Sequence, residues 1–554
     1  MLRRISFLTA RDQVRCDLCV VGAGPAGLAA AIKYKQLRPQ AEVLVLERGV
    51  ELGAHILSGA VLETRALEEL LPHWQSQGAP IQTKVSQERL LFLSPNKATE
   101  VRTDLLPAAL SNTHNYLVSL GDLVQWLGEQ AKSIGIHVVA GFPANDLLIS
   151  SRGFVSGVVT GAAGKSKDFF QDSGFQPSFD IEAKQTIFAE GANGLLSDRL
   201  IKNFKLRGVF DIEREPSEQT YGLGLKESWL VPSQSPGLCL HTFYHPLSDH
   251  SFGYGFVYTR EEGKVDVGFV LGLDYQNPNL DPFETFQEWK RHPEIRKILE
   301  GGKCVGFGAK TLSMGGLYSV PKVSFPGGAL VGCGAGFFNP AKGKGIHTGM
   351  KSGMLAAEAI SSLGDKSEGV DPLRYNELFR QSWVLSTQLW EELHSSRDFR
   401  TSFYNNTTWG LFRTYMAYTI RQGRRRKYQV KPPGFACSDS ERTHWLEKAT
   451  KLQYGKSDGV LTFSKEESWQ KSGSVITQGA KPVIEVTNQT SSFLSFRDFK
   501  GMETRICPTG VFSVSPSGDL AISPSRCVLC KACQVKVPGV YLQIHNPEAG
   551  EGPH

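Results

Sequence analysis

The sequence has no apolar run long enough to cross a membrane. No stretch reaches the ~18 consecutive apolar residues that a spanning helix needs, so a spanning helix is excluded, although attachment to a membrane surface is not. Cysteine is also scarce: ten cysteines in 554 residues are too few for a disulfide scaffold and fit a reducing compartment. Neither sign of charge dominates, because 61 basic and 55 acidic residues leave +6, which is too diffuse to indicate nucleic-acid binding.

Glycine, in contrast, is abundant. The chain has 57 glycines among its 554 residues, above the usual ~7%, which indicates many places where the backbone approaches a neighbour or a ligand closely. The length suits roughly three to four domains. A content of 40% hydrophobic and 21% charged residues is typical of a globular chain.

The N-terminal segment 1–12 contains Arg3, Arg4 and Arg11 and no acid before Asp12. An arginine-rich, acid-poor start is typical of an organelle transit peptide, so we predict a possible targeting segment here. An ordinary bacterial N-terminus is the alternative interpretation.

A dinucleotide-binding unit follows at once. Residues 16–21 read as a buried strand that runs into Gly22, Gly24 and Gly27, and a predicted helix and second strand then lead to Glu47. The glycines allow the tight turn, the close approach of a pyrophosphate and the packing of helix on strand. The acid that ends the second strand is placed to bond a ribose hydroxyl. Strand, glycines, helix and acid together favour a Rossmann-like domain.

Two later segments favour FAD over NAD. Residues 185–194 and 327–336 each read as a strand that runs into glycines, at Gly191 and Gly332, and a Gly- and Ala-rich helix is predicted over 346–361. The N-terminus of such a helix can face the electron-rich edge of a flavin. A close-packed helix with no ligand is the alternative.

Four cysteines crowd the C-terminal region: Cys527, Cys530 and Cys533 at two-residue spacing, and Cys507 20 residues before the first of them. Three close thiolates and one remote thiolate can bind one [4Fe–4S] cluster. A structural zinc site and unligated thiols are the alternatives. The tight triplet with a lone fourth cysteine favours the cluster over the paired CxxC knuckles of zinc.

Between these sites the pattern changes. Residues 241–273 alternate strongly and are rich in aromatics, which predicts an antiparallel sheet capping the flavin. The aromatic helix predicted over 409–420 runs into the basic segment 421–427. An anionic membrane surface attracts such a combination. An ordinary solvated helix end is the alternative interpretation. Residues 455–500 read as a connector.

From about Cys16 to Pro538 the chain resembles the electron transfer flavoprotein:ubiquinone oxidoreductases. The resemblance implies FAD, quinone and cluster domains on a monotopic membrane protein, expected to be a monomer. Such a protein takes electrons from reduced electron transfer flavoprotein, itself fed by acyl-CoA oxidation, and reduces ubiquinone in the respiratory chain. The segments that carry the resemblance are 20–28, 53–60, 115–124, 186–191, 272–278, 344–353 and the four cysteines.

The resemblance also implies a place in the cell and roles for further residues. The expected location is the matrix face of the mitochondrial inner membrane, or the inner face of a bacterial cytoplasmic membrane. The four cysteines become the cluster ligands. Gly253 and Tyr254 take the quinone positions, although the family has a glycine where Tyr254 stands, and Thr348 takes the place of a flavin-facing hydroxyl, next to a glycine that is usually alanine. Membrane-inserting segments map to 58–79 and to the region around 337–356.

The fold predicted from these observations is mixed α/β and α+β: a glutathione-reductase-type FAD domain interleaved with an antiparallel quinone sheet, and a small ferredoxin-like [4Fe–4S] lobe. The predicted domains are an FAD-binding domain (13–80, 140–205 and 300–365), a ubiquinone-binding cap (81–139 and 206–299), a helical region and connector (366–500) and the cluster domain (501–554).

Two other functions stay open at this point. One is an FAD-dependent monooxygenase or prenyl reductase of the same fold, in which the cluster is structural. The other is a non-catalytic, membrane-attached module that binds an electron carrier. The electron-transfer function requires no side-chain nucleophile.

Overall fold

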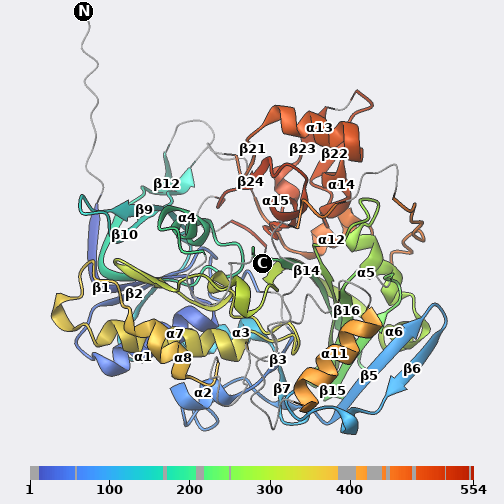
Figure 1. The fold of residues 1–554 in the computed structure, drawn as a ribbon, viewed down its shortest axis with the longest axis horizontal. Coiled ribbons are helices and arrows are strands. Elements are labelled where there is room, and N and C mark those ends of the chain that lie inside the picture. The colour runs from blue at the N-terminus through green and yellow to red at the C-terminus, as the bar shows by residue number, and fades with distance from the viewer. Residues whose placement is uncertain are drawn as a thin grey trace, which may run out of the picture.

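Figure 1 shows the chain, in a computed structural model, as two large sheets with a C-terminal lobe above them. The structure describes residues 12–56, 59–165, 171–207, 218–248, 251–384, 393, 403, 407–420, 439–443, 449–476, 482–517, 519–547 and 551–553. The predicted targeting segment lies outside these residues except for its last position, and the basic segment 421–427 lies outside them entirely.

The first sheet has eight strands and is mainly parallel. Its centre is β1 (Gln13–Val21), which pairs in parallel with β2 (Val43–Leu46) and β13 (Asp180–Phe188), while β13 pairs with β20 (Gly328–Leu330). The last four residues of β1 are buried, as expected for a strand covered on both faces. The other strands are β8 (His137–Val139), β9 (Ala144–Ile149), β10 (Val155–Thr160) and β19 (Ser324–Phe325).

Two small-residue helices pack together beneath this sheet. They are α1 (Pro25–Leu37) and α7 (Ile346–Ser361), drawn in blue and yellow in Figure 1. A side chain at Gly353 would stand 2.2 Å from the carbonyl oxygen of Ala26, so the helices touch backbone to backbone. The helix predicted over 346–361 is confirmed with the same bounds. Further helices of this part are α2 (Arg65–Leu70), α3 (Leu120–Ser133), α4 (Leu195–Asn203) and α8 (Arg374–Gln381).

The second sheet has seven strands in the order β18, β14, β17, β16, β15, β5 and β6. The antiparallel sheet predicted over 241–273 is confirmed, because β15, β16 and β17 are antiparallel neighbours. The bounds are β5 (Gln87–Ser94), β6 (Lys97–Val101), β14 (Tyr221–Leu230), β15 (Leu238–Tyr244), β16 (Gly253–Thr259), β17 (Lys264–Gly272) and β18 (Lys303–Ser313), with α5 (Pro282–Lys290), α6 (Pro293–Leu299) and α11 (Thr407–Ile420) beside them. Small sheets comprise β3 (Ala60–Leu62), β4 (Thr83–Lys84) and β7 (Tyr116–Val118), and β11 (Ala163–Lys165) and β12 (Gln171–Gln176).

The two sheets divide the chain at slightly different positions from those predicted. Helix α3 and strand β8 precede the predicted boundary at 139, yet β8 pairs with β2 of the first sheet. Strand β18 follows the predicted boundary at 300, yet it pairs with β14 of the second sheet. In both cases the strand pairs its backbone groups at the edge of the other sheet, and composition does not reveal such pairing.

The C-terminal lobe begins earlier than predicted. The connector expected over 455–500 contains α12 (Lys465–Lys471), β21 (Ile484–Val486) and α13 (Gln489–Phe499), and β21 pairs with β24 (Leu542–Ile544) at the far end of the lobe. The polar composition misled the prediction, because two of the polar residues, Ser464 and Asn488, cap α12 and α13 rather than form a linker. The lobe also contains α14 (Met502–Ile506), β22 (Phe512–Val514), β23 (Leu520–Ile522) and α15 (Ala532–Lys536).

A fully buried ion pair crosses from the second sheet to α5. The ammonium of Lys290 lies 2.8 Å from both carboxylate oxygens of Glu227, and both side chains have no exposed surface. The indole of Trp229 also donates to this carboxylate, at 2.9 Å. Neither charge has water to solvate it, so each depends on the other.

The Lys290→Met variant is therefore expected to lower the free energy of unfolding by about 3–5 kcal/mol, because it leaves the Glu227 carboxylate buried without its counter-ion. Denaturation in urea, followed by tryptophan fluorescence, measures the change. The double variant Glu227→Gln with Lys290→Met is expected to recover part of the loss. Equal stability of the single variant and the wild type would contradict the argument.

Candidate functional site

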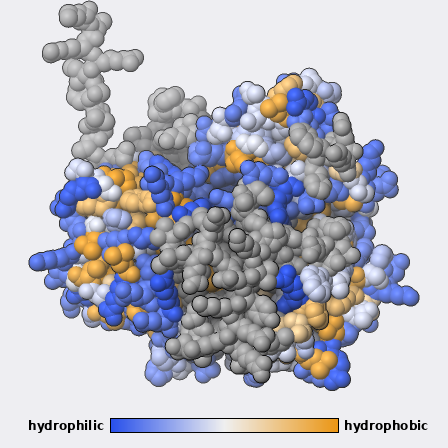
Figure 2. All heavy atoms as spheres, viewed as in Figure 1, coloured by the Kyte–Doolittle hydropathy of each residue, from blue (hydrophilic) through white to orange (hydrophobic). Residues whose placement is uncertain are grey.

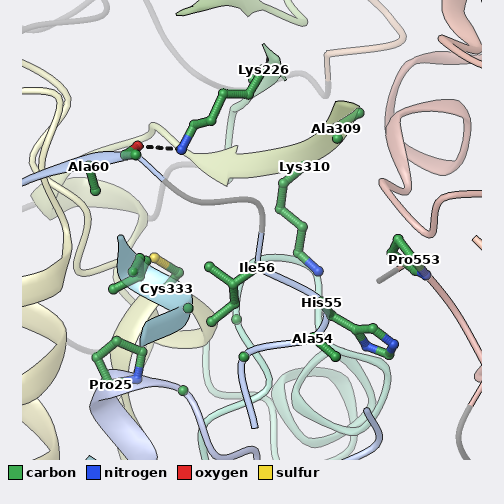
Figure 3. Close-up of a pocket in the computed structure, with 18 of the residues that line it drawn as sticks. Pro25, Ala54, His55, Ile56, Ala60, Lys226, Ala309, Lys310, Cys333 and Pro553 are labelled. Carbon is green, nitrogen blue, oxygen red and sulfur yellow. Dashed lines mark hydrogen bonds between the residues drawn. The ribbon is translucent and has the colours of Figure 1, made fainter. Parts of the chain in front are cut away.

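A cavity of about 920 Å³ lies between the two sheets. Its walls come from both ends of the chain: Gly22 and Gly24 on one side, and Val528, Lys531 and Pro553 on the other. Figure 3 shows Lys226 and Lys310 reaching into it from the second sheet, opposite Pro25 and Ile56 of the first domain. The volume suits a large cofactor or ligand.

The loop between β1 and α1 is built for an anion. Gly22 has φ +102°, and a side chain there would meet the carbonyl oxygen of Ala189 at 2.6 Å. A side chain at Gly27 would meet the carbonyl oxygen of Gly22 at 2.0 Å, so only glycine lets α1 pack here. No atom lies within 4 Å of the Cβ position of Gly24, which caps α1 without any side-chain bond. The N-terminal N–H groups of α1 therefore face open space that suits a pyrophosphate.

The carboxylate of Glu47 lines the cavity and is held by backbone amides. Ala23 N donates to one of its oxygens at 3.0 Å, and Gly49 N donates to the other at 2.8 Å. These bonds hold the carboxylate at the end of β2, beside the glycine loop. A ribose hydroxyl beside it would find an acceptor already oriented.

The two other predicted glycines also line the cavity. Gly191 has φ +78° and no atom within 4 Å of its Cβ position, so it leaves open space for a ligand. Gly332 has φ +62°, and its N–H donates to Ser352 Oγ at 2.9 Å. The Thr348 hydroxyl, in contrast, donates to the carbonyl oxygens of Phe337 and Gly345 and does not line the cavity. Its role toward a flavin stays a prediction.

The predicted quinone residues lie at the start of β16. Tyr254 lines the cavity, and burial raises the pKa of its hydroxyl well above the usual range, so the hydroxyl is neutral. Gly253 is closely packed, because a side chain there would meet Val270 O at 2.7 Å. The extra bulk of Tyr254 is accommodated by Gly343, whose Cβ position lies 2.9 Å from the tyrosine hydroxyl. The chain thus has a small residue opposite the large one.

The four C-terminal cysteines gather in one buried loop region. Each is 6–8% exposed, and none forms a disulfide. Backbone amides donate to two of the sulfurs, Val511 N to Cys507 Sγ and Leu529 N to Cys527 Sγ, both at 3.4 Å. The positive φ angles of Leu529 and Lys531 allow the loop to wrap in this way. Amide donors at thiolate sulfurs are typical of iron–sulfur sites.

The donor set fits a polynuclear group better than a single ion. Burial raises the pKa of the Cys530 thiol to about 12, so thiolates here need a bound cation. Within the described part of the chain, no three His, Cys, Asp or Glu side chains form a site for a single metal ion. Four buried thiols, two of which accept bonds from backbone amides, are a donor set that fits a [4Fe–4S] cluster.

The cluster loop and the cavity share a wall that the sequence did not reveal. Thr311 N on β18 donates to the carbonyl oxygen of Cys530 at 3.3 Å. The neighbouring Lys310 lines the cavity together with Arg48 and Lys531. Burial and the charges of these two cations lower the pKa of Lys310 to about 7. These cations come from three distant segments of the chain, so no sequence motif contains them together. The high glycine content was the one sequence signal that indicated a ligand site in this region.

The structure corrects the predicted membrane segments. In the region around 337–356, Phe337 has no exposed surface and α7 is buried along most of its length. In 58–79, Leu67 and Trp74 are 0% and 4% exposed. Helix α2 of the first segment packs against α7 and α1, so these apolar side chains lie in the interior. They are not exposed at the protein surface.

Comparisons with known proteins agree with these sites. A family model described as "ETF-QO, ubiquinone-binding" matches residues 221–312, the second sheet. A model described as "Electron transfer flavoprotein-ubiquinone oxidoreductase, 4Fe-4S" matches residues 459–554, the lobe with the four cysteines. A model of an NAD(P)-binding Rossmann-like domain matches residues 20–82. The second match begins before 501 and agrees with the early start of the lobe.

Whole proteins match as well. The mitochondrial electron transfer flavoprotein-ubiquinone oxidoreductase of Rattus norvegicus is 41% identical over 562 residues, covering 97% of this chain and 88% of its own. That of Dictyostelium discoideum is 39% identical over 580 residues, covering 99% and 91%. A solved geranylgeranyl bacteriochlorophyll reductase-like structure from Thermoplasma acidophilum shares the fold, with TM-score 0.52 and 18% identity over 74% of this chain and 98% of that one. The chain belongs to the electron transfer flavoprotein-ubiquinone oxidoreductase family.

Proposed function

We propose that this protein takes electrons from reduced electron transfer flavoprotein and passes them to ubiquinone, linking acyl-CoA oxidation to the respiratory chain. One observation supports this most strongly: the cysteine loop forms part of the wall of the cavity that suits FAD. Val528 and Lys531 line that cavity, and Thr311 N bonds to Cys530 O at 3.3 Å. A cluster with only a structural role need not lie beside the flavin site. Electron transfer between two groups, in contrast, requires them to lie close together.

FAD and one [4Fe–4S] cluster are the cofactors, and together they supply one- and two-electron chemistry when bound. The protein's own residues bind, orient and shield them. Gly22, Gly24 and Gly191 leave room for the pyrophosphate, and Glu47 accepts from the ribose. Cys507, Cys527, Cys530 and Cys533 would ligate the cluster. Tyr254 lines the cavity, so it and its neighbour Gly253 at the start of β16 would hold the quinone.

The proposed location is the matrix face of the mitochondrial inner membrane. The similar proteins of rat and Dictyostelium are named as mitochondrial, and ubiquinone is a lipid-soluble acceptor. Among the described residues, no helix combines the length and apolar character that crossing a bilayer requires. We therefore propose attachment to one leaflet by a single copy of the chain.

Helix α11 is the proposed attachment site. Trp409, Phe412 and Tyr415 are 47%, 51% and 37% exposed and recur at three-residue spacing, so they share one side of the helix. Thr407 and Tyr418 are buried on the other side. Figure 2 shows hydrophobic surface at the lower right, where Figure 1 draws α11. Exposed aromatic side chains of this kind suit the boundary between headgroups and acyl chains.

Replacing Trp409, Phe412 and Tyr415 with serine is expected to weaken binding to anionic vesicles by at least about tenfold, because burial of each aromatic side chain contributes about 1.5–3 kcal/mol. Co-sedimentation with vesicles measures the affinity. Phe493→Ser is the matched control, since Phe493 is 60% exposed but lies on the C-terminal lobe. An equal loss in the control would contradict a specific role for α11.

The function is tested directly with purified protein. It should contain flavin, iron and acid-labile sulfide, oxidise reduced electron transfer flavoprotein, and reduce a short-chain ubiquinone at the same rate. Consumption of a nicotinamide nucleotide without the partner protein would instead support the monooxygenase or prenyl reductase alternative.

A further inference from the structure

Reduction of a quinone requires protons as well as electrons. Each quinone that becomes a quinol takes up two electrons and two protons, and electrons that pass through an iron–sulfur cluster arrive without protons. Ionisable groups that line the cavity can supply a proton to the quinone. The second sheet contributes both ionisable side chains and the predicted quinone residue Tyr254 to the cavity wall.

The cavity face of this sheet has an apolar part and a polar part. The apolar part surrounds Tyr254 and Phe256, together with Val270 and Leu312. The polar part contains Ser228, Arg260, Lys264 and Asp266. Lys226 stands at the border between them, because the strand register places it beside Gly268, which in turn lies beside Phe256.

Lys226 lines the cavity. Its ammonium lies 5.8 Å from the centre of the Phe256 ring and donates to the carbonyl oxygen of Gly59 at 2.5 Å. Figure 3 shows its side chain extended into the cavity. A side chain at Gly268 would stand 2.2 Å from the Phe256 ring, so this glycine leaves the room that Phe256 occupies beside the lysine.

The two tyrosine hydroxyls and the carboxylate beside this position are poor proton donors. Burial raises the pKa values of the Tyr254 and Tyr258 hydroxyls well above their usual range. Asp266 is an acceptor, because Ser228 Oγ and Arg260 Nε each donate to it at 2.7 Å. Burial lowers the pKa of Lys226 to about 8, while Asp266 raises it and Arg260 lowers it further. A donor with a pKa near the working pH transfers protons best.

A route for resupply leads from Lys226 to the surface. The side chains of Asp266 and Arg260 are 1% and 11% exposed, whereas that of Lys264 is 46% exposed, and all of them line the cavity. Side-chain exposure thus increases from Asp266 through Arg260 to Lys264. Protons from solvent can reach the amine along this wall without crossing the apolar part.

We propose that Lys226 is a proton donor to the quinone, an inference that rests on the proposed function. As two electrons reach the quinone, one N–H bond of the Lys226 ammonium breaks and an O–H bond forms at a quinone oxygen. The lysine becomes a neutral amine and recovers its proton from solvent through the polar part. The second proton of the quinol comes from solvent independently.

The test compares Lys226→Met and Lys226→Arg with the wild type, using two electron acceptors. With ubiquinone, both variants are expected to lower kcat about 100-fold and to leave KM within about twofold. With ferricenium, an acceptor that takes no proton, both are expected to match the wild type. Arginine keeps the positive charge but does not release a proton, so it separates proton donation from electrostatics.

The pH profile gives an independent readout. The wild-type rate with ubiquinone is expected to fall as pH rises through about 8, because the ammonium form is lost, and both variants should lack this limb. Lys303→Met is the control, since Lys303 is an exposed residue at the far end of β18. Flavin and cluster spectra verify that each variant is loaded.

Two results would overturn the proposal: a Lys226→Met rate with ubiquinone equal to that of the Lys303→Met control, or restoration of the rate by Lys226→Arg. A wild-type protein that reduces ferricenium but not ubiquinone would instead contradict the proposed function, so the two failures are distinguishable.

Discussion

Replacing Cys530 with serine is expected to remove the iron signal of the purified protein and to lower electron transfer from reduced electron transfer flavoprotein to quinone by at least about two orders of magnitude. A serine hydroxyl does not replace a thiolate as an iron ligand at neutral pH. The loop that carries Cys530 also contacts the second sheet, since the carbonyl oxygen of Cys530 accepts a hydrogen bond from Thr311 N on β18. Electron paramagnetic resonance of the reduced protein measures the cluster, and stopped-flow spectroscopy measures the rate.

Cys304→Ser is the matched control for this variant. Cys304 is 7% exposed, as buried as Cys530, but its thiol bonds to the carbonyl of Gly306 on the second sheet. It should keep both the cluster signal and the rate. If Cys530→Ser reduced quinone with the partner protein as fast as the wild type, the cluster would have no essential place in electron uptake.

Replacing Gly24 with alanine is expected to lower the FAD content by at least about tenfold while leaving the fold intact. No atom of the protein lies within 4 Å of the added methyl group, so the chain tolerates it. The methyl group would nevertheless occupy the space in which the pyrophosphate approaches α1. Flavin absorbance after purification and a thermal melt of the apoprotein measure the two effects separately.

Gly27→Ala tests a position at which the added methyl group would collide with the protein itself. Its methyl group would stand 2.0 Å from the carbonyl oxygen of Gly22 and 3.1 Å from the Cβ of Ala189, so α1 must move away from the sheet. We expect loss of both stability, by about 1–3 kcal/mol or more, and FAD. Wild-type FAD affinity in Gly24→Ala would show that the pyrophosphate does not lie at this helix terminus.

The parts of the site that could be predicted from sequence are those built from contiguous residues. The glycine loop around Gly22, the helix 346–361 and the cysteine triplet each occupy one short segment, and each has a spacing that chemistry dictates. Their secondary structure is confirmed. The family resemblance then assigned the fold class, which the fold and the comparisons confirm.

The parts that could not be predicted depend on pairing between distant segments. The polar group around Lys226 and the cations around Lys310 assemble only when the second sheet forms, because strand register decides which side chains share a face. Burial was misjudged for the same reason: the apolar residues of 58–79 look available to lipid until α2 packs against α7, which lies much later in the chain. Exposure is a property of the completed fold.

The shared wall between the two ends of the chain constrains how the protein is made. A ribosome that has synthesised residue 500 has completed Gly22 and both sheets, but Val528, Lys531 and Pro553 of the cavity wall do not yet exist. Domains generally fold as they emerge, at ~5–20 residues per second, so the glycine loop can form before residues 528–553 of the cavity wall have been made. Completion of the cavity therefore follows synthesis of the segment that contains the cysteine triplet, and a chain truncated near residue 500 would lack these residues of the wall.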